Sequence, residues 1–514
     1  MKIKFISLSV FVCGAATMIL ELLGSRMLAP YVGASIFVWT NLIGVVLAFL
    51  SLGYLWGGKL ADEEADPRTY SRVILFSAVW LGLLAFVCDP VLAWNSLLIR
   101  DIRLAALINT ILLLGAPSFL LGMIPPYAAK LGLVSIEHTG RNTGNIYALS
   151  TAGSLAGTFL TGFVLLSFFS NQSILLILGV VLAVTSLLVS GCNRKAKSLL
   201  AVVFFVFSFL PDASAALFGG HGFADVNTPY NRVWIYDLPI GGPARVRMMQ
   251  INDEWASLHF LDSDELVSRY ARYYRLAAHF SPGLKKVLML GGAGYSYPQD
   301  FLRCNPQGRI DVVEIDPGVT ELARKYFGLT NGPRLRVVHE DARMYLNRNF
   351  IQYDVIYGDV FRSTMIPFHL TTEECFRRVH GSLSDQGVLM INLISSLEGP
   401  NGRFLKGELA TLKKIFPQVY VFATRDPQDR QGVQNLMVVA LKSARTPSWR
   451  NPDEELQDYL GSLCKTPDLE GAPIFKDSFA PVEFYSLGIL DAAANPKNPR
   501  AIYWGARLDP NQKD

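Results

Sequence analysis

The stretch that decides the fold of the second half of this chain is Lys286-Val287-Leu288-Met289-Leu290-Gly291-Gly292-Ala293-Gly294. Its four consecutive apolar residues predict a buried strand, and its glycines predict a tight turn into a helix. A glycine turn lets a ligand approach the backbone closely, and the helix N-terminus that follows favours negative or polar groups. The stretch therefore indicates a ligand site at Gly291, Gly292 and Gly294.

An acid in the next predicted strand narrows the kind of ligand. Glu314 lies twenty residues after Gly294, near the end of a second apolar run, Ile310–Asp316. A carboxylate at the tip of the second strand, at about this distance, can accept hydrogen bonds from both ribose hydroxyls. The glycine turn and Glu314 together predict a nucleoside-binding βαβ unit.

Further apolar runs alternate with helical segments as far as residue 442. The runs cover residues 287–291, 309–315, 335–339, 353–358, 387–395, 419–425 and 436–442. Such alternation predicts a doubly wound parallel sheet, and the polar segment 426–432 predicts an antiparallel hairpin at its end. The expected fold class is an α/β seven-strand Rossmann-type domain, similar to that of S-adenosylmethionine-dependent transferases.

The carboxyl ends of the third and fourth predicted strands carry the other candidate site residues. Ligands of such sheets lie beyond these ends, where the sequence places Asp341 and Ala342, and then Asp359. Asp341 is suited to accept a hydrogen bond from an adenine amino group, and Asp359 would face the group that reacts. The alternative for either acid is that it caps the helix that follows.

A small β region is expected ahead of this domain. Gly219–Gly222 is typical of a linker, and residues 232–236 and 244–249 predict a hairpin that turns at Gly241–Pro243. Residues 262–279 predict an amphipathic helix beside the cleft. The candidate substrate-binding residues here are Tyr230, Tyr270 and Tyr273. Their alternative role is core packing with a satisfied hydroxyl.

The first half of the chain is expected to lie in a membrane. Of the 514 residues, 51% are hydrophobic and 18% charged, with a mean hydropathy of +0.28, and the apolar excess lies before about residue 215. Runs long enough to span a bilayer cover residues 5–24, 38–57, 73–94, 104–124, 145–168 and 172–191. Two Gly-x-x-x-Gly pairs, Gly53/Gly57 and Gly153/Gly157, permit close helix packing. A shorter seventh run, Ser198–Leu210, is expected to be interfacial or re-entrant.

The distribution of positive charge predicts the orientation. With the N-terminus inside, the inner segments hold Lys2, Lys4, Lys59, Arg68, Arg72, Lys130, Arg141, Arg194, Lys195 and Lys197, and the outer loops hold only Arg26, Arg100 and Arg103. Because positive residues mark cytoplasmic loops, six spans leave the second half in the cytoplasm, whereas seven would place it outside. We expect an integral protein of a bacterial inner membrane with its soluble part in the cytoplasm.

The expected organisation is a membrane domain over residues 1–215, a linker with the small β region and cleft helix over 216–285, and a catalytic domain over 286–514. The net charge of +4 is too small to suggest a nucleic-acid partner. The six cysteines show no metal-binding spacing, and no metal is expected.

The run from Val287 to Ser395 resembles the spermidine/spermine synthase family, the polyamine aminopropyltransferases, above all its membrane-fused bacterial members. The similar motifs are Val313–Asp316, Glu340–Ala342, Tyr353–Ile356, Pro367–Thr372 and Asp477–Glu483. The resemblance implies that Glu314 holds the ribose, Asp341 the adenine, and that Asp359 is the first acid of a catalytic loop. It further implies decarboxylated S-adenosylmethionine as co-substrate, methylthioadenosine as product, a polyamine as acceptor, and allows a homodimer.

The sequence departs from the family's pattern at two carboxylates. Soluble members carry an Asp at the position of Gly294, which holds the amino end of the co-substrate, and a second loop acid where Val360-Phe361-Arg362 follow Asp359. Two alternatives therefore stay open. One is a methyltransferase that uses S-adenosylmethionine itself, and the other is a non-catalytic nucleoside or polyamine sensor coupled to a transporter-like membrane domain.

Overall fold

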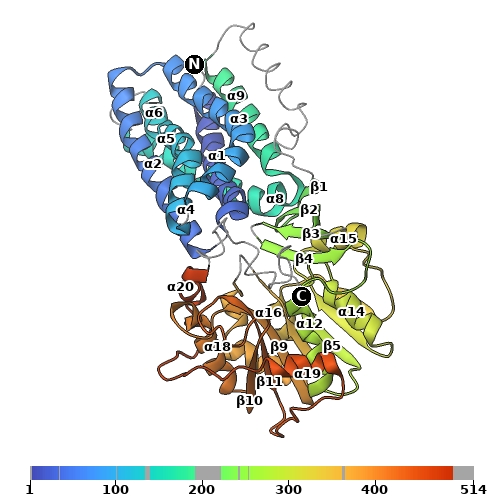
Figure 1. Cartoon of the computed structure of the whole chain (residues 1–514). Coiled ribbons are helices and arrows are strands. Elements are labelled where there is room, and N and C mark those ends of the chain that lie inside the picture. Colours follow the sequence, from blue (N-terminus) through green and yellow to red (C-terminus); the bar gives the residue numbers. More distant parts are fainter. Residues whose placement is uncertain are drawn as a thin grey trace. The chain divides into compact units, whose positions relative to one another are not determined.

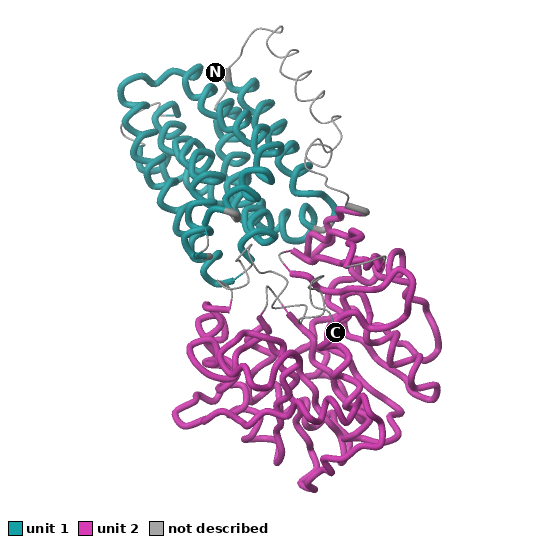
Figure 2. Tube along the Cα trace, in the orientation of Figure 1, with its two compact units in different colours: residues 1–220 teal, residues 221–514 magenta. Residues whose placement is uncertain are grey.

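The computed structural model describes residues 3–33, 35–99, 101–132, 139–190, 222–240, 244–252, 254–361 and 365–489. They form two compact units, residues 1–220 and 221–514 (Figure 2). The small β region thus shares a unit with the seven-strand sheet. The seventh apolar run, the turn Gly241–Pro243, Arg362 and most of the linker Gly219–Gly222 lie outside the described residues.

The first unit is helical (Figure 1). Its described elements are α1 (Ile3–Val32), α2 (Ile36–Glu63), α3 (Pro67–Leu98), α4 (Ile102–Thr110), the π-helical turn η1 (Ile111–Gly115), α5 (Ala116–Gly122), α6 (Ile124–Leu131), α7 (Thr139–Leu160), the π-helical turn η3 (Thr161–Leu165), α8 (Leu166–Phe168) and α9 (Asn171–Ser190). Asp66 and Asp101 cap α3 and α4 by accepting hydrogen bonds from backbone N–H groups of the first turn.

Six stretches of the described helices are long and apolar enough to cross a membrane. They cover Lys4–Val32, Ile36–Glu63, Pro67–Asn95, Arg103–Leu131, Thr139–Leu165 and Asn171–Val189, and they contain most of each of the six predicted runs. Glycines let neighbouring helices touch through their backbones. A Cβ at Gly153 or Gly157 of α7 would overlap backbone atoms of Phe11 or Ala15 of α1. The predicted role of this Gly-x-x-x-Gly pair in close packing is confirmed.

The second unit begins with a four-strand antiparallel sheet. Its strands are β1 (Gly222–Asn227), β2 (Arg232–Pro239), β3 (Arg245–Ile251) and β4 (Glu254–Phe260), in the order β1-β2-β3-β4. The predicted hairpin is β2 and β3, whereas β1 and β4 were not predicted. Between β3 and β4 the pairing shifts, since Met249 faces Ser257 while Gln250 faces Trp255. Ala256 is therefore the extra residue of a β-bulge, a device common beside active sites.

The seven-strand sheet follows, as predicted. Its strands are β5 (Lys286–Leu290), β6 (Arg309–Val313), β7 (Leu335–Val338), β8 (Tyr353–Gly358), β9 (Leu383–Ser395), β10 (Gln418–Ala423) and β11 (Gln434–Leu441). Their order is β10-β11-β9-β8-β5-β6-β7, parallel except where β11 pairs antiparallel with β9 and β10. The expected fold class is confirmed.

Helices cover both faces of this sheet (Figure 1). The longer ones are α14 (Ser296–Cys304), α15 (Pro317–Tyr326), α16 (Ala342–Arg348), α17 (Glu373–Gly381), α18 (Arg403–Lys413) and α19 (Glu454–Gly461), and α20 (Val482–Tyr485) is a single turn. Because side chains alternate along a strand, Val287 and Met289 of β5 enter one core with α14 and α15, while Leu288 and Leu290 enter another with α16, α17 and α18.

The predicted cleft helix over 262–279 is wrong in its first half. The chain becomes helical only at α12 (Arg269–Tyr273) and continues as the 3₁₀ turn η4 (Tyr274–Leu276) and α13 (Ala277–Phe280). Ser263 accepts a hydrogen bond from the backbone N–H of Glu265 (3.1 Å), and Leu266 pairs with His259 of β4. The Asp- and Ser-rich segment 262–265 thus satisfies its backbone as a turn instead of a helix.

A buried acid joins the two sheets. Asp316, the N-cap of α15, is fully buried and accepts hydrogen bonds from Thr228 Oγ1 (2.5 Å) and Asn231 Nδ2 (2.8 Å), in the segment between β1 and β2. These bonds attach the small sheet to Asp316, which is two positions after Glu314 in the sequence.

The helix contacts of the first unit give a test. Gly153→Ala forces a methyl group against the Phe11 carbonyl, whereas Gly44→Ala enters open space. We expect the first substitution to destabilise the protein by about 1–3 kcal/mol, the usual cost of overpacking, and the second to leave stability unchanged or raise it, because alanine favours helix. Thermal unfolding in detergent measures both, and equal melting temperatures for the two variants would contradict the packing role.

Candidate active site

A cavity of ≈ 490 Å³ lies at the carboxyl ends of β5, β6 and β8. The small sheet and α12 supply further parts of its wall. It brings together eight of the predicted site residues, Gly291, Gly292, Glu314, Asp341, Ala342, Asp359, Tyr230 and Tyr270. Gly294 and Tyr273 do not line this cavity. Segments far apart in the sequence thus converge where the predicted topology places a ligand.

The glycine turn after β5 is held by Glu314. Glu314 Oε2 accepts hydrogen bonds from the N–H groups of Gly292 (2.9 Å) and Ala293 (3.2 Å), and Oε1 accepts from Asp316 N (3.0 Å). Burial raises the pKa of Glu314, and these three backbone donors oppose that shift. A carboxylate has about four acceptor sites, so Glu314 keeps capacity for ribose hydroxyls while it shapes the turn.

Gly291 brings the glycine turn against the end of β8. Its φ is +89°, in the region that favours glycine, and a Cβ there would overlap the carbonyl oxygen of Asp359. A larger residue at position 291 would therefore displace Asp359. The glycine fixes the separation between the predicted nucleoside side of the cavity and the predicted catalytic acid.

Asp359 is surrounded by neutral hydrogen-bond donors. Asn392 Nδ2 donates to its Oδ1 (3.2 Å), and Asn435 Nδ2 in turn donates to Asn392 Oδ1 (3.0 Å). Burial raises the pKa of Asp359 to about 6, and hydrogen bonds from Asn392, Tyr270 and Tyr274 limit the shift. A carboxyl group with this pKa accepts and releases protons near neutral pH.

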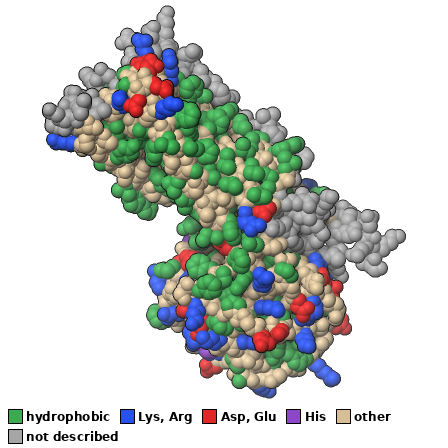
Figure 3. All heavy atoms as spheres, turned by 90° about the vertical axis from the view of Figure 1, so that its left-hand side faces the viewer, with side chains coloured by type: hydrophobic (Ala, Val, Ile, Leu, Met, Phe, Trp, Pro, Cys, Tyr) green, Lys and Arg blue, Asp and Glu red, His purple; other side chains and the backbone are tan. Residues whose placement is uncertain are grey.

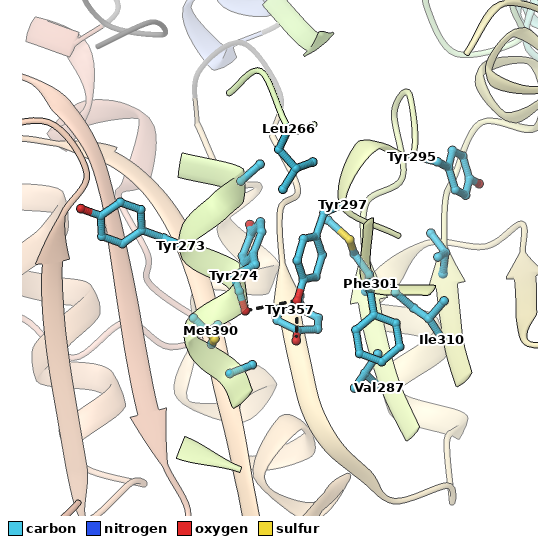
Figure 4. Close-up of a cluster of buried hydrophobic side chains, with 14 of the residues drawn as sticks. Leu266, Tyr273, Tyr274, Val287, Tyr295, Tyr297, Phe301, Ile310, Tyr357 and Met390 are labelled. Carbon is cyan, nitrogen blue, oxygen red and sulfur yellow. Dashed lines mark hydrogen bonds between the residues drawn. The ribbon is translucent and has the colours of Figure 1, made fainter. Parts of the chain in front are cut away.

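A cluster of buried tyrosines lies beside Asp359, and Tyr274 of this cluster hydrogen-bonds to it. Figure 4 shows Tyr274, Tyr297 and Tyr357 packed together, and the Tyr297 hydroxyl oxygen lies 2.8 Å from the Tyr357 hydroxyl and 3.2 Å from the Tyr274 carbonyl oxygen. Their ring centroids are 4.9 to 5.2 Å apart. Tyr274 and Asn392 contact Asp359 but were not predicted. The signal for Asn392 was a lone amide within the apolar run of β9.

The two tyrosines of α12 predicted to bind substrate have different environments. Tyr270 lines the cavity, and burial with the nearby carboxylates of Asp359 and Glu254 raises its pKa well above the usual value. Tyr273 is 1% exposed, stacks on Tyr459 at 4.3 Å and donates its hydroxyl to the Ala423 carbonyl (3.3 Å). Tyr273 therefore has the core-packing role that was its alternative.

Asp341 caps a helix and also lines the cavity. Its Oδ1 accepts a hydrogen bond from Met344 N (3.0 Å) at the start of α16, and its Oδ2 lies 3.5 Å from His369 Nε2. The capping alternative is thus satisfied by one oxygen. The second oxygen lies beside His369, which also lines the cavity, and the adenine role of Asp341 remains a prediction.

The charge of the described cavity lining is one-sided. It holds five carboxylates, Glu254, Glu314, Glu340, Asp341 and Asp359, and among the described lining residues there is no lysine and no arginine. Glu340 is paired with the exposed Arg348 outside the cavity. A lining of this kind attracts cationic ligands and disfavours anionic groups.

The residues that form this cavity lie in a part of the chain that is similar to known proteins. Residues 273–446 match the spermine/spermidine synthase domain. A polyamine aminopropyltransferase of Vibrio vulnificus is 33% identical over 156 residues, which cover 30% of this chain and 50% of that protein. Polyamine aminopropyltransferase 1 of Streptomyces coelicolor is 25% identical over 387 residues, 68% of each chain, so this similarity extends beyond residues 221–514 into the helical unit.

A methyltransferase is also similar. The N-terminal histidine N-methyltransferase of Emericella nidulans is 32% identical over 187 residues, which cover 35% of this chain and 32% of that protein. The chain thus spans half the length of the Vibrio relative and a third of the Emericella one. The matched domain contains the glycine turn, Glu314, Asp341 and Asp359. The C-terminal domain of this chain belongs to the spermine/spermidine synthase family.

Proposed function

We propose that this protein is a membrane-integrated polyamine aminopropyltransferase. It would move an aminopropyl group from decarboxylated S-adenosylmethionine to a polyamine nitrogen and release methylthioadenosine. The observation that carries the proposal is the cavity lining, with five carboxylates and no lysine or arginine among its described residues. Both reactants are cations, and the co-substrate's aminopropyl end carries no carboxylate that would require a positive partner.

The residues have roles that follow from their positions. Glu314, Gly291 and Gly292 would hold the nucleoside, and Asp341 the adenine. Asp359, with a pKa near 6, would take the proton of the acceptor ammonium, with Tyr270 and Asn392 orienting its carboxylate. The freed nitrogen forms a bond to the aminopropyl carbon while the carbon–sulfur bond breaks. The electron pair of the broken bond stays on sulfur and neutralises the sulfonium. The cavity contributes by holding both partners in line.

Methyl transfer from S-adenosylmethionine is the second candidate. The similarity to a histidine N-methyltransferase favours it. That cofactor, however, carries a carboxylate, which would enter a cavity whose described charges are all negative. Aminopropyl transfer is therefore the better supported of the two reactions.

The helical unit supports a membrane location. Figure 3 shows hydrophobic side chains over much of its visible surface, and its exposed large side chains include Leu55, Trp56, Phe76, Phe163 and Phe168. Six apolar helices with such an exterior are suited to lipid. We propose that residues 1–215 span a bacterial inner membrane and that the catalytic part, comprising 216–285 and 286–514, faces the cytoplasm.

Calorimetric titration of the detergent-purified chain tests the reaction. We expect decarboxylated S-adenosylmethionine to bind more tightly than S-adenosylmethionine, and methylthioadenosine to bind as the product. Transfer to putrescine or spermidine should then be detectable. Preference for the intact cofactor would indicate methyl transfer, and binding without turnover would indicate the sensor.

Replacing the proposed base gives a sharper prediction. Asp359→Asn should lower kcat by about 100- to 10,000-fold, the usual contribution of a general base, with little change in methylthioadenosine affinity. Its melting temperature should be unchanged or higher, because burial disfavours the ionised carboxylate that the amide replaces. Exposed Asp385→Asn is the control. A fully active Asp359→Asn would remove this residue from the mechanism.

The pKa of Asp359 also predicts a pH profile. A proton acceptor must be ionised, so kcat/KM of the wild type should rise with pH up to about 6 and then level off with respect to this group. The profile of kcat/KM for the acceptor amine is measured between pH 5 and 8 with decarboxylated S-adenosylmethionine held saturating. A wild-type profile without an acidic limb would contradict the assignment of Asp359 as the base.

Glu314 should control nucleoside affinity. Glu314→Gln places an amide N–H₂ where backbone N–H groups now donate to a carboxylate. Hydrogen bonds to charged groups contribute about 1.5–3 kcal/mol, so we expect methylthioadenosine affinity to fall at least about tenfold. Glu321→Gln on the exposed surface of α15 is the matched control. Unchanged affinity in the Glu314 variant would mean that the nucleoside binds elsewhere.

A further inference from the structure

Three polar side chains form a hydrogen-bonded chain beside the glycine turn. Ser257 Oγ of β4 lies 2.6 Å from Ser296 Oγ, and Ser296 Oγ lies 2.6 Å from His259 Nε2. Ser296 is the first residue of α14, and the His259 ring packs edge-on against Phe327 at 5.0 Å. The proposed catalytic steps above use none of these three residues.

The polar chain separates two cavities. Ser257 and Ser296 line the cavity of the candidate active site. His259 and Ser296 line a second cavity of ≈ 610 Å³, bounded by β4, α14 and the segment from Tyr326 to Leu335. The hydroxyl end of the chain thus lies at the active-site cavity, and the imidazole supports it from the second cavity.

Ser257, the first residue of this hydrogen-bonded series, occupies the space that a side chain at position 294 would need. A Cβ on Gly294 would lie 2.5 Å from Ser257 Oγ and 2.7 Å from Ser257 Cβ, closer than real contacts allow. By the resemblance to the spermidine/spermine synthase family, soluble members carry an Asp at position 294, and this Asp is expected to hold the amino end of the co-substrate. In the present protein, the side chain of Ser257 fills that space.

The three hydrogen-bonded side chains, Ser257, Ser296 and His259, are uncharged near neutral pH. Burial lowers the pKa of His259 to about 4, although the nearby Asp264 and a hydrogen bond to the Gly294 backbone oppose the shift. When Ser296 donates to Nε2 of the neutral ring and accepts from Ser257, both hydroxyl oxygens keep at least one lone pair that is not used among the three side chains. Both hydroxyls can therefore accept a hydrogen bond from an N–H donor in the cavity.

We propose that Ser257 and Ser296 bind the ammonium at the aminopropyl end of decarboxylated S-adenosylmethionine, and that His259 is a positioning residue for their hydroxyls. This inference rests on the proposed aminopropyl transfer. The acidic cavity lining attracts the cation, and the two hydroxyls fix where its terminal nitrogen lies. The β-bulge at Ala256 sits directly before Ser257, where a local change of register can redirect a side chain.

Two ligands that share the methylthioadenosine portion give the test. Decarboxylated S-adenosylmethionine carries the aminopropyl group on a sulfonium, and methylthioadenosine lacks this group and has a neutral thioether; this difference in charge on sulfur is the same for the wild type and the variant. Ser257→Ala should weaken binding of the former about tenfold, the effect of one hydrogen bond to a charged group, and leave the latter within about twofold. Ser263→Ala, in the turn before α12, is the matched control and should change neither. Equal effects of Ser257→Ala on both ligands, or none, would overturn the proposal.

The positioning role of His259 needs a separate readout. His259→Asn should raise KM for decarboxylated S-adenosylmethionine several-fold while kcat at saturation and methylthioadenosine affinity stay near wild type. A loss of kcat with unchanged KM would overturn this role.

A third experiment replaces the hydroxyl of Ser257 by a carboxylate at position 294, which would occupy the same space. Gly294→Asp alone should clash with Ser257, whereas Ser257→Gly with Gly294→Asp frees the space and supplies a carboxylate. We expect the double variant to bind the co-substrate at least tenfold more tightly than Ser257→Gly alone, with equal methylthioadenosine affinity. Equal co-substrate affinity of these two variants would overturn the inference. Whether the wild type binds decarboxylated S-adenosylmethionine more tightly than S-adenosylmethionine tests the proposed function, and this measurement needs none of the variants.

Discussion

The absence of side-chain volume in the turn after β5 is the constraint on which this site depends. Gly291 touches the backbone of Asp359, Gly294 touches Ser257, and Glu314 binds the N–H groups between them. Three strands and the small sheet thus meet around one short turn. Any side chain at either glycine would move a residue that the proposed chemistry uses. The two glycines are therefore required for contacts within the protein.

Buried carboxylates set the energetic character of the site. Burial raises the pKa of both Glu314 and Asp359, so each is ionised at a cost that its hydrogen bonds only partly offset. For Glu314 the partners are backbone N–H groups, which fix the turn. For Asp359 they are neutral side chains, which leave the acid able to exchange a proton. The same physical effect thus accompanies a structural role at Glu314 and the proposed chemical role at Asp359.

The sequence was sufficient for features carried by long apolar runs or by fixed spacing. The seven strands of the large sheet, the six long helices, and the placement of Glu314 and Gly292 in one cavity follow from such patterns. Features set by tertiary contacts were missed. β4 mixes polar and apolar residues, so Ser257 and His259 went unnoticed, and Tyr274 differs from Tyr273 only by one position on a turn. The helix predicted at residue 262 failed because a local Ser263 turn satisfies the backbone first.

The proposed membrane location would have a consequence for the supply of the proposed acceptor amine. Close to the inner face of a membrane, within about one Debye length of ~8 Å, the electric double layer of anionic lipids concentrates cations. A surface potential of about −30 mV enriches a divalent amine roughly tenfold over bulk cytoplasm, and a trivalent amine more strongly. This location would then raise the local acceptor concentration without any additional contact in the cavity, and it would favour the more highly charged amines. This enrichment would weaken as ionic strength rises.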